Sequence, residues 1–346
     1  MMLRNTLKIL SQKIKLPNAS ESVRNLHKAT AVFAKKPAGE KSSDVKDSNE
    51  NKEEASQPTP PPLILVEADG PITLIGINRP DHRNAVNADT AHALCEAFSN
   101  FENNEESTIA VLYGVGGSFC SGYDIHELVS GDNISTDLLM LQEGSVGPTR
   151  RHLKKPVICA INGYCVANGL ELALMCDLRV MEESATLGFF NRRFGVPIID
   201  GGTARLPSMI GFSRALDLIL TGRQINASEA HQMGLVNRVV ATGTALGQAV
   251  NLAGSIAKFP QAALNHDRNS LYSATFESHN FNQAIQNEIM YTSKEILEEM
   301  EIGIKKFSEG KIRGTGTENV KEKSMADWEK EEIAKEEETK NKDKNN

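Results

Sequence analysis

Apolar residues in the middle of the chain fall into short runs that alternate with turns. The runs at residues 63–66 and 72–77 flank Asp69-Gly70-Pro71, a pattern that predicts a hairpin at the start of the folded part. Residues 109–113 and 157–160 are apolar almost throughout, as in strands buried on both faces. The pattern therefore predicts a sheet of short, buried strands that begins with this hairpin.

Helical patterns lie between these runs. The segment from Asn87 to Thr90 can cap a helix that extends to about residue 102. Further strands are predicted at residues 178–181, 186–189 and 235–240, and further helices at residues 227–233 and 245–307. This alternation of strands and helices predicts an α/β fold.

The stretch from Lys155 to Val180 combines a strand, a turn, the start of a helix and one acidic residue. Asn168-Gly169 opens a helix that is apolar nearly all round, so we expect it to be buried. Glu171 lies in its first turn. A carboxylate there is either stabilised by the helix start or placed to do chemistry, and the local pattern leaves both interpretations open.

Two glycine turns follow buried strands in the same way. Residues 114–124 resemble a dinucleotide-binding loop only in part, because Phe119 occupies the position of the third glycine. Residues 157–168 repeat the order of apolar strand, glycine turn, cysteine and helix start. Two such turns side by side can direct two backbone N–H groups at one oxygen, as enzymes of acyl groups do for an oxyanion.

Two segments around the central stretch stay ambiguous at this level. Residues 131–150 are largely polar and contain several glycines, which predicts a mobile loop. Asp200 precedes Gly201-Gly202 and a helical pattern. It is either the cap of that helix or a catalytic acid.

The composition of the 346-residue chain argues against several classes of function. The net charge of −7 and the pI near 5.7 argue against a nucleic-acid partner. The five cysteines form no CxxC pair, which favours reduced, buried thiols in a reducing compartment. No run of 18 apolar residues occurs, so we expect no membrane span. Nothing in the pattern indicates a metal or a redox cofactor.

The two ends of the chain differ from its middle. Residues 1–36 carry eight Lys or Arg against one acid, with leucines at helical spacing, which is typical of a mitochondrial transit peptide; a disordered basic tail is the alternative. Residues 37–62 have the composition of a disordered linker. Residues 315–346 form a tail rich in Lys and Glu.

Five segments in order resemble the enoyl-CoA hydratase/isomerase, or crotonase, family. They are INRPDHRNAV from Ile77, GGSFCSGYDIHEL from Gly116, the stretch from Lys155, GGTARLPSMIG from Gly201 and LTGRQINASEAHQMGLVNRVV from Leu220. The resemblance covers roughly residues 63–312. It implies a spiral of strand-strand-helix units over residues 63–255. It also implies a C-terminal helical section, residues 256–314, that completes homotrimers or hexamers.

The resemblance also implies a site. The two oxyanion N–H groups match Tyr123 and Asn168, where Asn replaces the family's usual glycine, and the first catalytic glutamate matches Glu171. The second glutamate position holds Asn191, an amide that can hold water but cannot transfer the proton. Some branches carry an Asp just before the equivalent glycines, which raises the expectation that Asp200 is catalytic. Burial is expected to raise the pKa of Glu171 towards neutrality.

The implied substrate is a coenzyme A thioester. Arg83 is the first choice for its phosphates, and Lys305, Lys306 and Phe307 are further ones, acting across a subunit interface. The leading hypothesis is an enoyl-CoA hydratase of the mitochondrial matrix. Enoyl-CoA isomerase, acyl-CoA hydrolase or decarboxylase, and a non-catalytic acyl-CoA-binding protein remain as alternatives.

Overall fold

The computed structural model describes residues 61–130, 133–134, 141–290 and 292–310. The predicted transit peptide, the charged tail and all but the last two residues of the predicted linker lie outside these ranges.

A six-stranded sheet runs through the core in the order β1-β2-β3-β6-β8-β11. β1 and β2 form the predicted antiparallel hairpin, and every other neighbouring pair in this sheet is parallel. The strands are β1 (Ile64–Asp69), β2 (Ile72–Ile77), β3 (Ile109–Gly114), β6 (Val157–Ile161), β8 (Leu178–Glu182) and β11 (Arg238–Val240).

A second sheet of three short strands turns the chain into a spiral. It has the order β10-β9-β7, with β7 (Tyr164–Val166) parallel to β9 (Thr186–Gly188) and β10 (Ile225–Asn226) antiparallel to β9. The chain therefore passes from β6 in the first sheet to β7 in the second and then into α5 (Asn168–Met175). This strand-strand-helix unit recurs in β8, β9 and α6 (Gly202–Ile210). The predicted fold class is confirmed.

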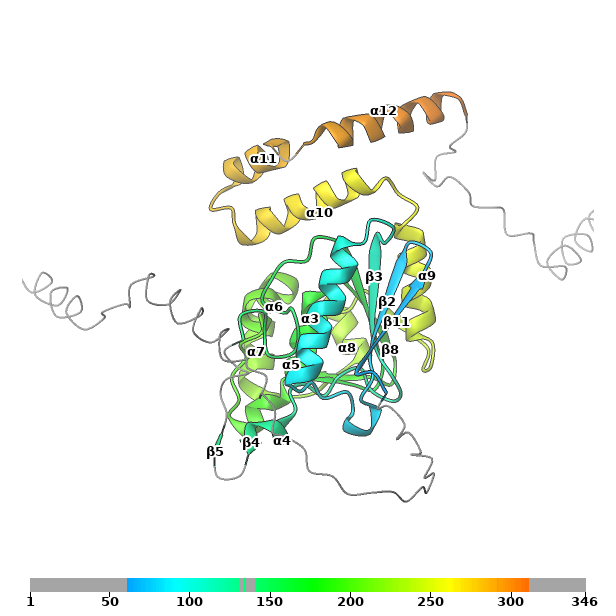
Figure 1. Cartoon of the computed structure of the whole chain (residues 1–346). Coiled ribbons are helices and arrows are strands. Elements are labelled where there is room, and N and C mark those ends of the chain that lie inside the picture. The colour runs from blue at the N-terminus through cyan, green and yellow to red at the C-terminus, as the bar shows by residue number, and fades with distance from the viewer. Residues whose placement is uncertain (1–60, 131–132, 135–140, 291, 311–346) are drawn as a thin grey trace, which may run out of the picture. The chain divides into compact units, whose positions relative to one another are not determined.

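Helices cover both faces of the large sheet. Along β3, Ala110 and Leu112 belong to the larger core with α3 (Ala88–Asn103) and α5, whereas Ile109 and Val111 belong to the core with α9 (Ala245–Ile256). This alternation follows from the two-residue repeat of a strand. Figure 1 shows α3 and α9 on opposite sides of the strands.

Capping chemistry sets the start of α3 where the sequence predicts it. The Asn87 side chain accepts a hydrogen bond from the Thr90 N–H at 3.0 Å. The other elements are α4 (Ile125–Leu128), β4 (Val129–Ser130), β5 (Asn133–Ile134), α7 (Phe212–Thr221), α8 (Ala227–Gln232), α10 (Gln261–Phe276), α11 (Phe281–Met290) and α12 (Lys294–Ser308), with 3-10 turns at Pro80–His82 and Phe190–Phe194. In the described ranges no helix is both long and apolar enough to cross a membrane.

A polar cluster on α10 joins the C-terminal helices to the core. Arg268 Nε lies 2.7 Å from Asp177 Oδ1, and the Tyr272 hydroxyl donates to the same oxygen at 3.1 Å. Arg268 Nη1 also donates to the Leu153 carbonyl at 2.8 Å. α11 and α12 in turn pack on α10.

Arg268→Gln should lower the free energy of unfolding by about 3 kcal/mol, because it leaves the mostly buried Asp177 carboxylate without its cation. Chemical denaturation measures this change. The control is Lys294→Gln, which breaks an exposed pair with Glu298 and should cost about 0.5 kcal/mol or less. Equal losses in the two variants would contradict the attachment of α10 through Arg268.

Candidate active site

The two glycine turns lie side by side, as the sequence predicts. The N–H of Phe119 donates to the Asn162 carbonyl at 2.8 Å, and the N–H of Cys120 donates to that of Tyr164 at 2.9 Å. The Val166 N–H returns a bond to the Cys120 carbonyl at 3.1 Å. This short ladder holds the turn after β3 against the turn after β6.

Tyr123 lies in a parallel bridge with Val86, and its N–H points away from Val86. Gly122 accepts from the Val86 N–H at 2.8 Å, and the Asp124 N–H donates to the Val86 carbonyl at 2.9 Å. In a parallel bridge the residue between these two contacts directs its own N–H to the opposite side. The Tyr123 N–H therefore takes no part in the hydrogen bonds with Val86.

Asn168 is the first residue of α5, where a backbone N–H has no acceptor within the helix. The lack of a side chain at Gly122 allows the two turns to approach closely, because a Cβ placed on it would lie 3.0 Å from the Asn168 nitrogen. Tyr123 and Asn168 both line one cavity of about 450 Å³. The structure thus assembles the two predicted oxyanion donors at a common cavity.

Glu171 is fully buried in the first turn of α5 and lines neither described cavity. Its Oε1 accepts from the N–H groups of Asp200 at 2.7 Å and Gly202 at 2.9 Å. Its Oε2 accepts from Asn168 Nδ2 at 3.0 Å. Burial and the neighbouring Asp200 carboxylate raise the pKa of Glu171 to about 8, although the two backbone hydrogen bonds act to lower it. Glu171 is therefore mostly protonated at neutral pH.

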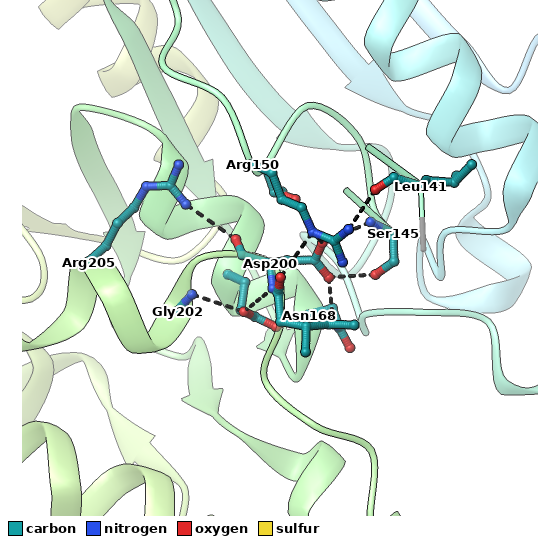
Figure 2. Close-up of polar contacts among 10 residues, drawn as sticks. Leu141, Ser145, Arg150, Asn168, Asp200, Gly202 and Arg205 are labelled. Atoms are coloured by element: carbon teal, nitrogen blue, oxygen red, sulfur yellow. Dashed lines mark hydrogen bonds and ion pairs between the residues drawn. The ribbon is translucent and has the colours of Figure 1, made fainter. Parts of the chain in front are cut away.

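Asp200 is also fully buried, and it does not cap the following helix. Its Oδ1 accepts from the Ser145 N–H at 2.8 Å and from Thr149 Oγ1 at 2.9 Å. Its Oδ2 accepts from Ser145 Oγ and, at 2.8 Å, from Asn168 Nδ2. Figure 2 shows this carboxylate beside Ser145 and Asn168. Arg150 Nε lies 3.7 Å from Asp200 Oδ1. The capping interpretation is wrong, because the carboxylate points to these donors.

The prediction of a mobile loop at residues 131–150 is wrong in the part that contains Ser145 and Thr149, and residues 131–132 and 135–140 lie outside the described ranges. Both residues are fully buried, and both form hydrogen bonds with the Asp200 carboxylate. Ser145 and Thr149 lie in a polar stretch that contains glycines and has no apolar periodicity. The sequence pattern of this stretch therefore did not indicate that they are buried.

Asn191 lines the same cavity as Tyr123 and Asn168 and is only 3% exposed. Its Nδ2 donates to the Pro197 carbonyl at 3.4 Å. Its buried Oδ1 has no hydrogen-bond partner in the described part of the chain. An unpaired buried carbonyl is costly, so this oxygen is suited to accept from a bound hydroxyl or water.

Of the predicted coenzyme A residues, the structure places one at the cavity. Arg83 is exposed, lines the cavity and lies 5.5 Å above the Tyr164 ring. Lys305, Lys306 and Phe307 lie in the last turn of α12 and line neither described cavity. Within one chain they are not brought to the site.

A larger cavity of about 930 Å³ lies between α10 and the core. Arg205 and His266 line it, but Tyr123, Asn168 and Asn191 do not. The two predicted oxyanion donors therefore belong to the smaller cavity. In the described ranges no group of three His, Cys, Asp or Glu side chains is arranged to hold a metal ion.

Comparison with known proteins identifies the family. The sequence profile described as enoyl-CoA hydratase/isomerase matches residues 67–313. The chain therefore belongs to the enoyl-CoA hydratase/isomerase family.

Individual relatives agree with this assignment. The enoyl-CoA hydratase EchA19 of Mycobacterium tuberculosis is 35% identical over 205 residues, 56% of this chain and 74% of that protein. The mevalonyl-coenzyme A hydratase sidH of Aspergillus fumigatus is 34% identical over 54% of this chain and 69% of that protein. A crystal structure of an enoyl-CoA hydratase from Mycobacterium tuberculosis superposes with a TM-score of 0.66 at 32% identity, covering 72% of this chain and 97% of that one.

Proposed function

We propose that the protein adds water to the double bond of a 2-enoyl-CoA. The observation that carries this proposal is that the Tyr123 and Asn168 turns meet at one cavity, and that the buried Glu171 accepts a hydrogen bond from the Asn168 side chain. Relatives of similar sequence are named enoyl-CoA hydratases, which supports the same reaction class.

In this mechanism the thioester oxygen lies between the Tyr123 and Asn168 N–H groups. Water held by Asn191 Oδ1 attacks the β-carbon, and the π electrons move into the thioester enolate, whose oxygen the two N–H groups stabilise. Glu171, protonated at neutral pH, gives its proton to the α-carbon. The proton released by the water returns to the Glu171 carboxylate, so the enzyme ends the cycle unchanged.

Asn191 favours a second reaction, a shift of the double bond. Isomerisation needs one group that removes and returns a proton and needs no activated water. A single acid, Glu171, with the oxyanion donors suffices for it.

Incubation with crotonyl-CoA and with a longer 2-enoyl-CoA separates hydration from isomerisation. Hydration removes the absorbance of the conjugated thioester and yields a 3-hydroxyacyl-CoA, whereas isomerisation yields a product of unchanged mass. No turnover of any ester in a CoA panel would favour a binding protein.

Asp200→Asn should lower kcat and shift its pH dependence. The Asp200 carboxylate raises the pKa of Glu171, so the variant lowers that pKa below about 8. Because Glu171 must be protonated to act as the acid, hydration is lost on the alkaline side, and this loss should move to lower pH. A kcat profile measured from pH 5 to 10 checks the direction. An unchanged profile would contradict a functional contact between the two acids.

The assembly we propose is a homotrimer or a hexamer of such trimers. α11 has no buried residue, and the C-terminal helices expose many large apolar side chains, an area that soluble monomers rarely leave uncovered. They are Leu271, Phe276, Phe281, Ile285, Ile289, Met290, Leu297, Met300, Ile302, Ile304 and Phe307. Subunit contact would bring Lys305 and Lys306 of one subunit towards the Arg83 side of the next cavity, where the CoA phosphates would lie. Light scattering during size-exclusion chromatography measures the mass, and a monomer would contradict the assembly.

The location we propose is the mitochondrial matrix. The basic, acid-poor residues 1–36 support import. Residues 1–40 fused to a fluorescent protein should direct it to mitochondria, and a diffuse cytosolic signal would contradict the proposal.

A further inference from the structure

The side chain of Asn168 makes contacts that its role as a backbone donor does not require. Its Nδ2 lies 3.0 Å from Glu171 Oε2 and 2.8 Å from Asp200 Oδ2. Both oxygens can accept from this nitrogen, and each of its two hydrogens has one carboxyl oxygen to bond. The residue is 1% exposed, so water does not compete for these bonds.

The contact falls on the Glu171 oxygen that carries the proton. Oε1 accepts two backbone N–H groups at 2.7 and 2.9 Å, which occupy both of its lone pairs. When Glu171 is protonated, the proton therefore sits on Oε2. This is the oxygen that Asn168 Nδ2 holds.

We propose that the Asn168 side chain is a positioning residue of the reaction, which binds Glu171 and Asp200 into one pair and fixes the proton-bearing oxygen relative to the oxyanion site. The backbone N–H of the same residue is one of the two donors for the thioester oxygen. One residue therefore sets both the place of the enolate oxygen and the place of the acid. The inference rests on the proposed acyl-CoA reaction and extends it to a residue whose side chain that reaction does not otherwise use.

The effect of losing the Asn168 amide on the pKa of Glu171 depends on the charged groups around the two acids. Asp200 and Arg205 act on Glu171, and Arg150 Nε lies 3.7 Å from Asp200 Oδ1. Donors to a carboxylate favour its ionised form. Replacing the amide with an apolar group of similar volume removes one donor from each acid without admitting water, so the pKa of Glu171 should rise above about 8.

The test compares Asn168→Leu and Asn168→Gly with the wild type on crotonyl-CoA. Asn168→Leu should lower kcat about ten- to a hundredfold, as expected for losing hydrogen bonds to charged groups, and should move the alkaline loss of activity to higher pH. Asn168→Gly keeps the backbone donor and adds no bulk to the cavity. It should lower kcat while changing KM much less.

The matched control is Asn162→Leu. Asn162 Nδ2 donates to the Gly116 carbonyl at 2.6 Å and so joins the same two turns without touching an acid. Its substitution should leave the pH profile in place. Wild-type kcat in both Asn168 variants, or an equal pH shift in Asn162→Leu, would overturn the proposal.

A measurement without substrate separates this inference from the proposed function. Because the folded pKa of Glu171, about 8, exceeds its ordinary value of 4.5, the folded state binds more protons, and the free energy of unfolding falls as pH rises between these values. In Asn168→Leu the fall should continue to higher pH. If the wild type turns over no CoA ester but this shift occurs, the pair stands and the proposed function fails. If turnover occurs and the shift is absent, the pairing role of Asn168 fails.

Discussion

Glu171→Gln is expected to lower kcat for hydration of crotonyl-CoA by about 10²- to 10⁴-fold, the contribution of a positioned acid or base. Glutamine has nearly the shape of the protonated glutamic acid but has no proton to transfer. Its carbonyl oxygen can still accept from the N–H groups of Asp200 and Gly202, which Glu171 Oε1 holds at 2.7 and 2.9 Å. Binding of the CoA ester should therefore change only a few-fold.

Stability distinguishes this loss from unfolding. The ionised wild-type Glu171 is disfavoured by burial and by Asp200, so glutamine should make the protein more stable near pH 8, and the fall of the free energy of unfolding between pH 4.5 and about 8 should shrink. Glu182→Gln is the control, because Glu182 is also buried and its Oε1 accepts from the Gly243 N–H at 2.9 Å, away from the cavity. An active Glu171→Gln enzyme, or a Glu182→Gln enzyme equally impaired, would contradict the role of Glu171.

Gly122→Ala is expected to lower kcat/KM by about 10²- to 10³-fold, the effect of removing one oxyanion donor. The Gly122 φ angle is +96°, and an added Cβ would lie 3.0 Å from both the Asn168 nitrogen and the Ala167 Cβ. The two turns must then separate, which misdirects the N–H groups of Tyr123 and Asn168 at the developing oxyanion.

Gly211→Ala supplies the control for backbone strain alone. Gly211 has a φ angle of +83° with nothing within 4 Å of an added Cβ, and it lies between α6 and α7. It should cost about 1 kcal/mol of stability and leave kcat/KM unchanged. Steady-state kinetics of both variants, with circular dichroism to verify folding, measure the difference. Normal kinetics in Gly122→Ala would contradict the placement of the oxyanion site between these turns.

The local pattern predicted those features whose causes are local. The hairpin of β1 and β2 follows from two apolar runs around Asp69-Gly70-Pro71, and the start of α3 follows from the capping side chain of Asn87. The buried helix at Glu171 was likewise evident, because residues on every side of it are apolar. The repeat of strand, glycine turn and cysteine indicated the pairing of the turns, which the ladder between Cys120 and Tyr164 confirms.

The local sequence pattern could not predict contacts between segments that are far apart in the chain. Asp200 precedes a helix, as a capping residue does, and only the fold reveals that Ser145 and Thr149 direct its carboxylate elsewhere. The side chain of Asn168 reaches Asp200 across 32 positions of sequence, and no spacing rule links such residues. The unpaired Oδ1 of Asn191 is likewise a property of its surroundings.

The most direct test of hydration through Glu171 is the product formed from crotonyl-CoA in ¹⁸O-labelled water, followed by mass spectrometry. The wild type should yield 3-hydroxybutyryl-CoA that carries one labelled oxygen, and Glu171→Gln should leave the substrate unconverted over the same period. A wild-type enzyme that returns crotonyl-CoA without label, or a Glu171→Gln enzyme that forms the labelled product at the wild-type rate, would contradict the account.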